Sequence, residues 1–132
     1  MQDLINTIVS KLGIDGALAE KAIGIVLSML KSEGPSDKVG ELLSKLPGAE
    51  DLIDKASDSG EGAGGGLGGL VASALGGGNP LMDTLSKLQS AGLDIDQAQK
   101  IGLEVLGFAK ENAGEDLVKE VADSIPGLSQ FI

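Results

Sequence analysis

The 132-residue sequence contains no histidine, cysteine, tryptophan, tyrosine or arginine, and only two phenylalanines. Without histidine, the usual general base near neutral pH is missing. Without cysteine, there is no thiolate nucleophile, no disulfide and no cysteine zinc site. Because all ten cationic residues are lysines, bidentate capture of a phosphate by arginine is not possible. We therefore expect no enzyme, no catalytic residues, no metal and no cofactor.

Positive charge is scarce, and the formal net charge is -10 with a pI near 4.2. This charge disfavours nucleic acid, which proteins hold mainly with lysine and arginine, and it disfavours anionic membrane surfaces. It favours partners that are basic or apolar.

Long hydrophobic runs are also absent. The longest strongly apolar stretch, 22–30, has nine residues, and roughly 18 are needed to span a bilayer. The first residues lack the basic n-region of a signal peptide. We therefore expect a cytoplasmic protein with no stable membrane insertion.

What the chain does contain is an internal repeat. Segments 15–53 and 94–132 are both 39 residues long and align without a gap. Among the identical pairs are Asp15/Asp94, Ala19/Ala98, Lys21/Lys100, Val26/Val105, Leu27/Leu106, Lys31/Lys110, Asp37/Asp116, Val39/Val118, Glu41/Glu120, Pro47/Pro126 and Gly48/Gly127. Since each half has about 50 residues, too few for a comfortable core of its own, we expect one core shared by both.

Apolar residues recur at helical spacing in both halves, and no alternating strand pattern is present. The first half predicts an amphipathic helix over 4–12, a nearly all-apolar central helix from 15 to 33, a third helix ending at 46, and a last short turn at 49–53. The second half repeats the three helices. The expected fold is all-α: two tandem three-helix repeats packed with pseudo-two-fold symmetry into one helical bundle, divided as 1–56, 57–80 and 81–132.

Glycine is concentrated between the halves, where ten of the 21 glycines fall within 57–80. Because glycine loses the most backbone entropy on ordering, this bridge is predicted to be a flexible connector. Its apolar residues predict one short helix that docks on the core: Leu67, Leu70, Val71, Ala74 and Leu75. The bridge matches neither a phosphate-binding loop nor a dinucleotide fingerprint, since it has no lysine at the required place and no preceding strand. Gly65 and Gly69 have membrane-helix spacing, but the apolar segment around them is too short.

The repeated Asp15 and Asp94 suggest an acid/base or metal pair on one interpretation. Helix N-capping explains them better, because both stand where a helix begins. Gln97 occupies the capping-box position after Asp94.

The repeated lysines lie on the two central helices: Lys21, Lys100, Lys31 and Lys110. A buried lysine can act as a nucleophile, but solvated lysines whose stems cover apolar surface are the stronger interpretation. Asp96, Lys100 and Glu104 have the spacing of helical ion pairs.

Carboxylates cluster before the glycines at Asp54, Asp58 and Glu61. They could bind calcium, but the spacing fails the EF-hand pattern, and solubilising linker charges explain them more simply. The Pro47–Gly48 and Pro126–Gly127 pairs are interpreted as turns that end equivalent helices.

Several segments carry a resemblance: GIDGALAEKAIGIVLSMLKSEGPSDKV, LPGAEDLI, GGGLGGL and AGEDLVKEVADSIPGLSQFI. Together, and in this order over nearly the whole chain, they resemble uncharacterised bacterial domains of unknown function of the VcgC/VcgE type. The resemblance implies a small all-helical bacterial protein, and it implies no activity, cofactor or catalytic residue.

Three hypotheses on function follow. The first is a non-catalytic interaction or structural module with a protein partner, or with copies of itself as a homo-oligomer. The second is a binder of an apolar ligand or lipid between the two repeats, with the bridge as a lid. The third, and the weakest, is a carboxylate-based, metal-dependent activity.

Overall fold

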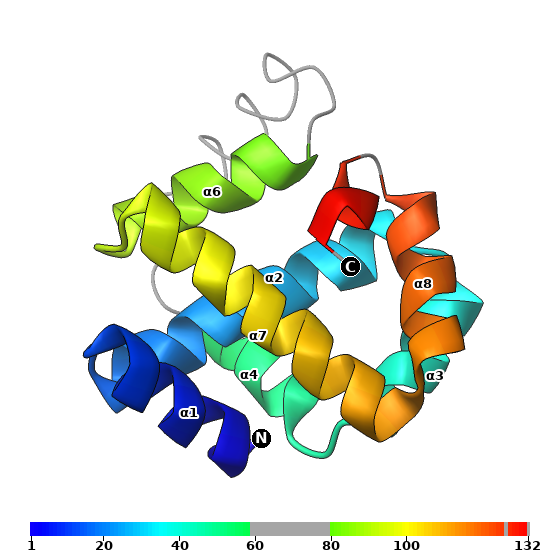
Figure 1. Cartoon of the computed structure of the whole chain (residues 1–132), viewed down its shortest axis with the longest axis horizontal. Helices are drawn as coiled ribbons and strands as arrows, with labels where there is room; N and C mark the ends of the chain where they lie inside the picture. The colour runs from blue at the N-terminus through cyan, green and yellow to red at the C-terminus, as the bar shows by residue number, and fades with distance from the viewer. Residues whose placement is uncertain (59–79, 126, 132) are drawn as a thin grey trace.

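The computed structural model describes residues 1–58, 80–125 and 127–131, and Figure 1 shows their arrangement. The elements of the first half are α1 (Gln2–Leu12), α2 (Gly16–Glu33), α3 (Ser36–Ser44) and α4 (Ala49–Asp58). Those of the second half are α6 (Pro80–Ser90), α7 (Ile95–Ala113), α8 (Glu115–Ser124) and the 3-10 helix η1 (Leu128–Phe131). No strand occurs in these ranges, so the all-α prediction is confirmed. The bridge, including its predicted short helix, lies almost wholly outside the described residues.

Glycines end several helices where the sequence predicts it. Gly13 has a φ of 67°, which is left-handed, and its N–H donates to the Val9 carbonyl at 2.9 Å to close α1. Gly114, with a φ of 100°, separates α7 from α8. Gly34 ends α2 at a place where a side chain would not fit, since an added Cβ would lie 2.5 Å from Val39 Cγ2. Pro35 is the residue that precedes α3.

Helix α2 is the centre of the molecule and packs against α1, α3, α4, α6 and α7. Its buried side chains extend around most of the helix, as the nearly all-apolar pattern predicts. In Figure 1, α7 crosses the front of the molecule over α2, and α4 lies behind. The middle position of α2 explains why its sequence leaves so little polar surface.

The two halves are joined by contacts that cross between them. Helix α1 packs on α7 as well as on α2, α6 packs on α2 as well as on α7, and α3 packs on α8. One cluster of buried apolar side chains contains residues of both halves. The shared core means that neither half encloses its own apolar surface.

Helix α4 is longer than the short turn expected at 49–53. Leu52, Ile53 and Ala56 are all buried, so the apolar stripe continues for a second turn and the helix extends to Asp58. Gly24 makes the packing of α4 on α2 close: an added Cβ would lie 2.1 Å from the Leu52 carbonyl oxygen and 2.8 Å from Ala56 Cβ.

Three other glycines inside helices do not bring a neighbouring helix close among the described residues. A Cβ built on Gly40, Gly102 or Gly107 meets no atom within 4 Å outside its own helix backbone. These three positions face open space because the neighbouring helices pack on other sides of α3 and α7. Glycine there has no packing role within the described chain.

Elements of the two halves begin at matching places. Gly16 and Ile95, Ser36 and Glu115, and Ala49 and Leu128 start successive elements, and each pair is separated by 79 residues. The lengths differ at the end, because α4 has 10 residues and η1 has 4.

Candidate functional site

The repeated aspartates occupy the helix starts, as the capping interpretation predicts. Asp94 precedes α7 and forms a capping box with Gln97, whose Oε1 accepts the Asp94 N–H at 3.0 Å. Asp15 precedes α2, but its side chain accepts no capping hydrogen bond. The two carboxylates therefore have the same position and different bonding, and they belong to separate helix ends.

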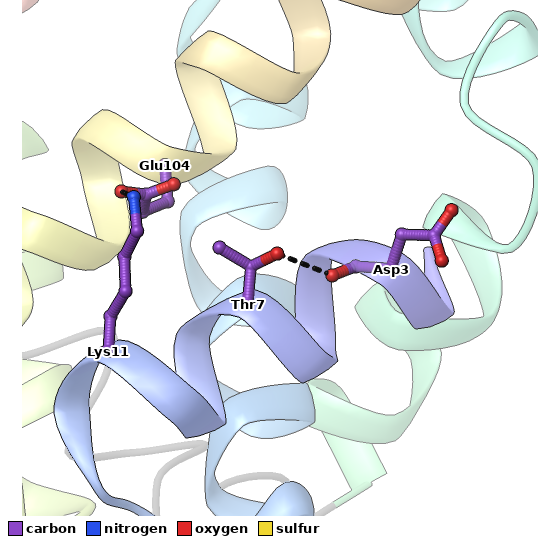
Figure 2. A network of polar contacts seen from close by, with 4 residues as sticks. All are labelled: Asp3, Thr7, Lys11 and Glu104. Carbon is purple, nitrogen blue, oxygen red and sulfur yellow. Dashed lines mark hydrogen bonds and ion pairs between the residues drawn. The ribbon is translucent and has the colours of Figure 1, made fainter.

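The repeated lysines are not gathered into a site. Lys31 and Lys100 are exposed, and Lys21 and Lys110 are half-buried. The ion-pair spacing of Asp96, Lys100 and Glu104 does not produce the expected pairs, because Glu104 binds Lys11 of α1 instead. Figure 2 shows this ion pair between α1 and α7, beside the hydrogen bond from the Thr7 hydroxyl to the Asp3 carbonyl at 2.8 Å.

Only part of the acidic cluster before the bridge lies within the described residues. Asp54 is exposed on α4, Asp58 is the last residue of that helix, and Glu61 lies outside the described residues. Within the ranges that the structure describes, no three carboxylates come together in a way that could hold a metal ion. Calcium binding at Asp54, Asp58 and Glu61 thus gains no support.

The two Pro-Gly pairs were interpreted as turns. Gly48 has a φ of 89° and Gly127 a φ of 84°, so both glycines take the left-handed backbone that ends a helix. Pro47 lies in the turn between α3 and α4, and Pro126 lies outside the described residues. The backbone at Gly48 and Gly127 thus has the geometry that the turn interpretation predicts.

Among the described residues, charged side chains link neighbouring helices on the surface. Lys11 binds Glu104, Lys55 binds Glu20 at 3.0 Å, and Lys38 binds Glu120 at 2.8 Å. Two of these pairs connect the halves: α1 to α7, and α3 to α8. Since all are exposed, each adds little stability and mainly favours one alignment of its helices.

The pKa shifts agree with this simple surface role. The hydrogen bond to Glu120, and then the charge of that carboxylate, raise the pKa of Lys38. Along α8, the hydrogen bond between Glu115 and Lys119 raises the pKa of the lysine and lowers that of the glutamate. These groups sit on the surface in ion pairs, and none has the buried surroundings of an acid or base catalyst.

A shallow hollow of about 340 Å³ lies over the turn between α3 and α4. Its lining residues are Gly40, Leu43, Ser44, Leu46, Pro47, Gly48, Glu50 and Asp51. All come from the first half, so this hollow is not the predicted ligand cavity between the repeats. Its open shape and mixed lining give a ligand little enclosure.

Apolar residues are also exposed on the side of α7 that faces away from α2 and near the start of this helix. Figure 1 shows no described element in front of this helix. We define this outer face by Asp96, Gln99, Leu103, Gly107 and Lys110, which fall on one side of a helix with 3.6 residues per turn. Leu103 is 47% exposed at its centre, and Ile95 is 52% exposed beside its start.

The sequence analysis does not single out Leu103 or Ile95, so the outer face was not predicted. A signal was present. The buried stripe of α7 contains Ala98, Ile101, Val105 and Ala109, and Leu103 lies on the opposite side of the helix from Ile101 and Val105. An apolar residue among polar ones on that side marks surface that the described chain does not cover.

The sequence prediction of no stable membrane insertion has support, since no described helix is both long and apolar enough to cross a bilayer. The resemblance to domains of the VcgC/VcgE type stays a prediction. No family model matches the chain, and no curated protein or solved structure matches it either.

Proposed function

We propose that this protein is a non-catalytic interaction module and that the outer face of α7 is its contact surface. The observation that carries the proposal is the exposure of Leu103, at 47%, in the middle of a face that no described element covers. A single exposed leucine is common on protein surfaces. Its importance here comes from comparing α7 with α2.

The comparison rests on treating the halves as tandem copies related by a pseudo-two-fold axis, which we also propose. Support comes from the 79-residue spacing between corresponding element starts. Further support comes from the packing between the halves: the first helix of each half, α1 or α6, packs on the central helix of the other half, α7 or α2. A two-fold relation would produce such exchanged contacts.

Under this relation, the outer face of α7 corresponds to the face of α2 that α4 covers. Glu20 and Gly24, which contact α4, correspond to Gln99 and Leu103. The element that corresponds to α4 is η1, which has 4 residues against 10 and packs against α8 and α7. In the first half, α4 thus covers this face of the central helix α2. In the second half, no described element covers the corresponding outer face of α7.

The remaining charged groups support a role in binding and not in catalysis. Thr84 is the one polar side chain buried among the described residues. The described carboxylates and lysines with shifted pKa values form surface ion pairs. The first prediction from composition, a module without an active site, is therefore retained as our proposal.

Site-specific photocrosslinking in cells that produce the protein tests the contact surface. A photoreactive amino acid is placed at Leu103, and a matched variant carries it at Asp54, an exposed helical position on α4. We expect discrete protein adducts from position 103 and few from position 54. Equal adduct patterns from both positions, or none from 103, would contradict the proposed contact surface.

A further inference from the structure

We propose that the occupant of the outer face of α7 is a second copy of this chain, bound with its own α7 antiparallel to the first and with Leu103 at the two-fold axis. This inference rests on the proposed function and names the partner. Four observations carry it: the spacing of charges along the face, their lack of ion-pair partners, an open glycine, and the exposure of Leu103.

The charges on the outer face are placed symmetrically about Leu103. Asp96 lies seven residues before it and Lys110 seven residues after it, which is about two helical turns in each direction. In an antiparallel pair centred on Leu103, Asp96 of each copy meets Lys110 of the other. A parallel pair would bring Asp96 to Asp96 and Lys110 to Lys110, so the charges favour the antiparallel arrangement.

These two residues are available for such contacts. Asp96 is exposed and Lys110 is half-buried, and neither forms an ion pair within the described ranges. The charge of Lys110 also helps to lower the pKa of Glu115, after the larger effect of Lys119. By contrast, Glu104, on the flank of the same helix, is held by Lys11. Asp96 and Lys110, which form no ion pair, are therefore on the face that the proposed dimer covers. On the flank that meets α1, Glu104 already has an ion-pair partner.

Gly107 supplies the independent observation. A glycine inside a helix is about 0.5–1 kcal/mol less favourable than alanine. Within the described chain Gly107 has no packing role that offsets this loss, because a Cβ there meets no atom within 4 Å. Gly24 shows what such a residue does when it is used: it lets α4 come close to α2. In the antiparallel pair, Gly107 lies opposite Gln99 of the partner copy, so the missing side chain lets the helices approach and Leu103 reach its counterpart.

The expected dimer is weak. A pair of single helices buries less than the roughly 1,200–2,000 Å² of stable interfaces. Each chain also has a net charge of -10, which repels a second copy over a range set by the ionic strength. We therefore expect a concentration-dependent monomer–dimer equilibrium at physiological salt, which suits a module that associates reversibly.

Sedimentation equilibrium of the full chain over a wide concentration range tests the proposal. We expect Leu103→Lys to weaken dimerisation at least about tenfold, since it places a charge at the centre of the contact. Asp96→Lys and Lys110→Asp should each weaken it through like-charge contacts, and the double variant should restore it by exchanging the pair. Failure of the double variant to recover above either single variant would overturn the proposed pairing.

Gly107→Ala and Gly40→Ala form a matched pair, because both glycines are inside helices and open to solvent. Both substitutions should raise the thermal stability of the monomer. Only Gly107→Ala should weaken the dimer, because only Gly107 lies on the outer face. Equal dimerisation of the two variants would contradict the close approach at Gly107, and the opposite effects of Gly107→Ala on stability and association separate this role from misfolding.

The outcomes also separate this inference from the proposed function. If the chain stays monomeric at all concentrations while photocrosslinks from position 103 reach a different protein, self-association is wrong and the interaction surface stands. If those crosslinks instead reach residues 59–79 of the same chain, that segment is the occupant and self-association is likewise wrong. If no adduct forms and no dimer exists, both proposals fail.

Discussion

At the residue scale, glycines inside helices have two different roles that the sequence alone does not distinguish. Gly24 sits beneath α4, where any side chain would collide with the Leu52 carbonyl. Gly40 and Gly107 sit in the same kind of helical pattern and face open space. The difference depends on which helix lies above each residue, and this is information that only the fold contains.

This contrast predicts opposite effects of the same substitution. Gly24→Ala should destabilise the protein by about 1–3 kcal/mol, because the backbone of α4 must move to accommodate the methyl group. Gly40→Ala should stabilise it by about 0.5–1 kcal/mol. Thermal and urea unfolding followed by far-UV circular dichroism measures both, and a gain in stability for Gly24→Ala would show that α4 does not pack this closely.

Lys38 offers a prediction about charge. Its pKa is raised mainly by the hydrogen bond to Glu120, and Glu41 contributes less. Glu120→Gln should therefore lower the pKa of Lys38 toward its ordinary value, and Glu41→Gln should lower it less. NMR titration of the lysine side chain measures the shift, and equal shifts in the two variants would rule out Glu120 as the main partner.

The sign of the pH effect follows from the same contact. Since folding raises the pKa of Lys38, the contribution of this pair to stability is present at neutral pH and is lost as the pH rises through the raised value. Glu115 behaves in the opposite sense. Its pKa is lowered by Lys119, so its contribution is lost as the pH falls through the lowered value.

At the element scale, the sequence predicted the bounds of some helices well and predicted α4 too short. Periodic apolar residues and glycine stops predicted α1 and α2 close to their actual ends. Helix α4 is longer than the turn predicted at 49–53, because Ala56 is also buried against α2 and extends the apolar stripe. Tertiary contact with α2 explains the second turn of this helix.

Helix caps give a prediction at this scale. Asp94 forms a capping box with Gln97, whereas the Asp15 side chain accepts no capping bond. Asp94→Ala should therefore cost about 1 kcal/mol of stability. Asp15→Ala should cost less, because only the favourable charge at the helix start is lost. Unfolding experiments on both variants measure the difference, and equal losses would contradict the different bonding at the two helix starts.

The candidate site was less predictable than the fold. Asp15, Asp94 and the repeated lysines recur for reasons of folding, and the structure distributes them over separate surfaces. The outer face of α7 was hidden because its importance depends on what covers the equivalent side of α2. That comparison requires the packing of α4 and η1, which the sequence alignment alone does not contain.

At the scale of the whole molecule, the two halves share one core and differ in the length of their last elements, α4 and η1. Contacts of α1 with α7 and of α6 with α2 tie the halves together, so we expect a single cooperative unfolding transition. Hydrogen exchange measured by NMR should give similar global opening energies for the centres of α2 and α7. Clearly separate opening energies for these two helices would contradict the shared core.

The proposed interaction surface is the outer face of α7, and its proposed occupant is a second copy of the chain. The most direct measurement is a dilution series of the isotopically labelled full chain, followed by amide and methyl NMR. We predict concentration-dependent shifts confined to the outer face, centred on Leu103, and unchanged signals from α3 and α4. Identical spectra at all concentrations, or shifts centred on another face, would contradict self-association through α7.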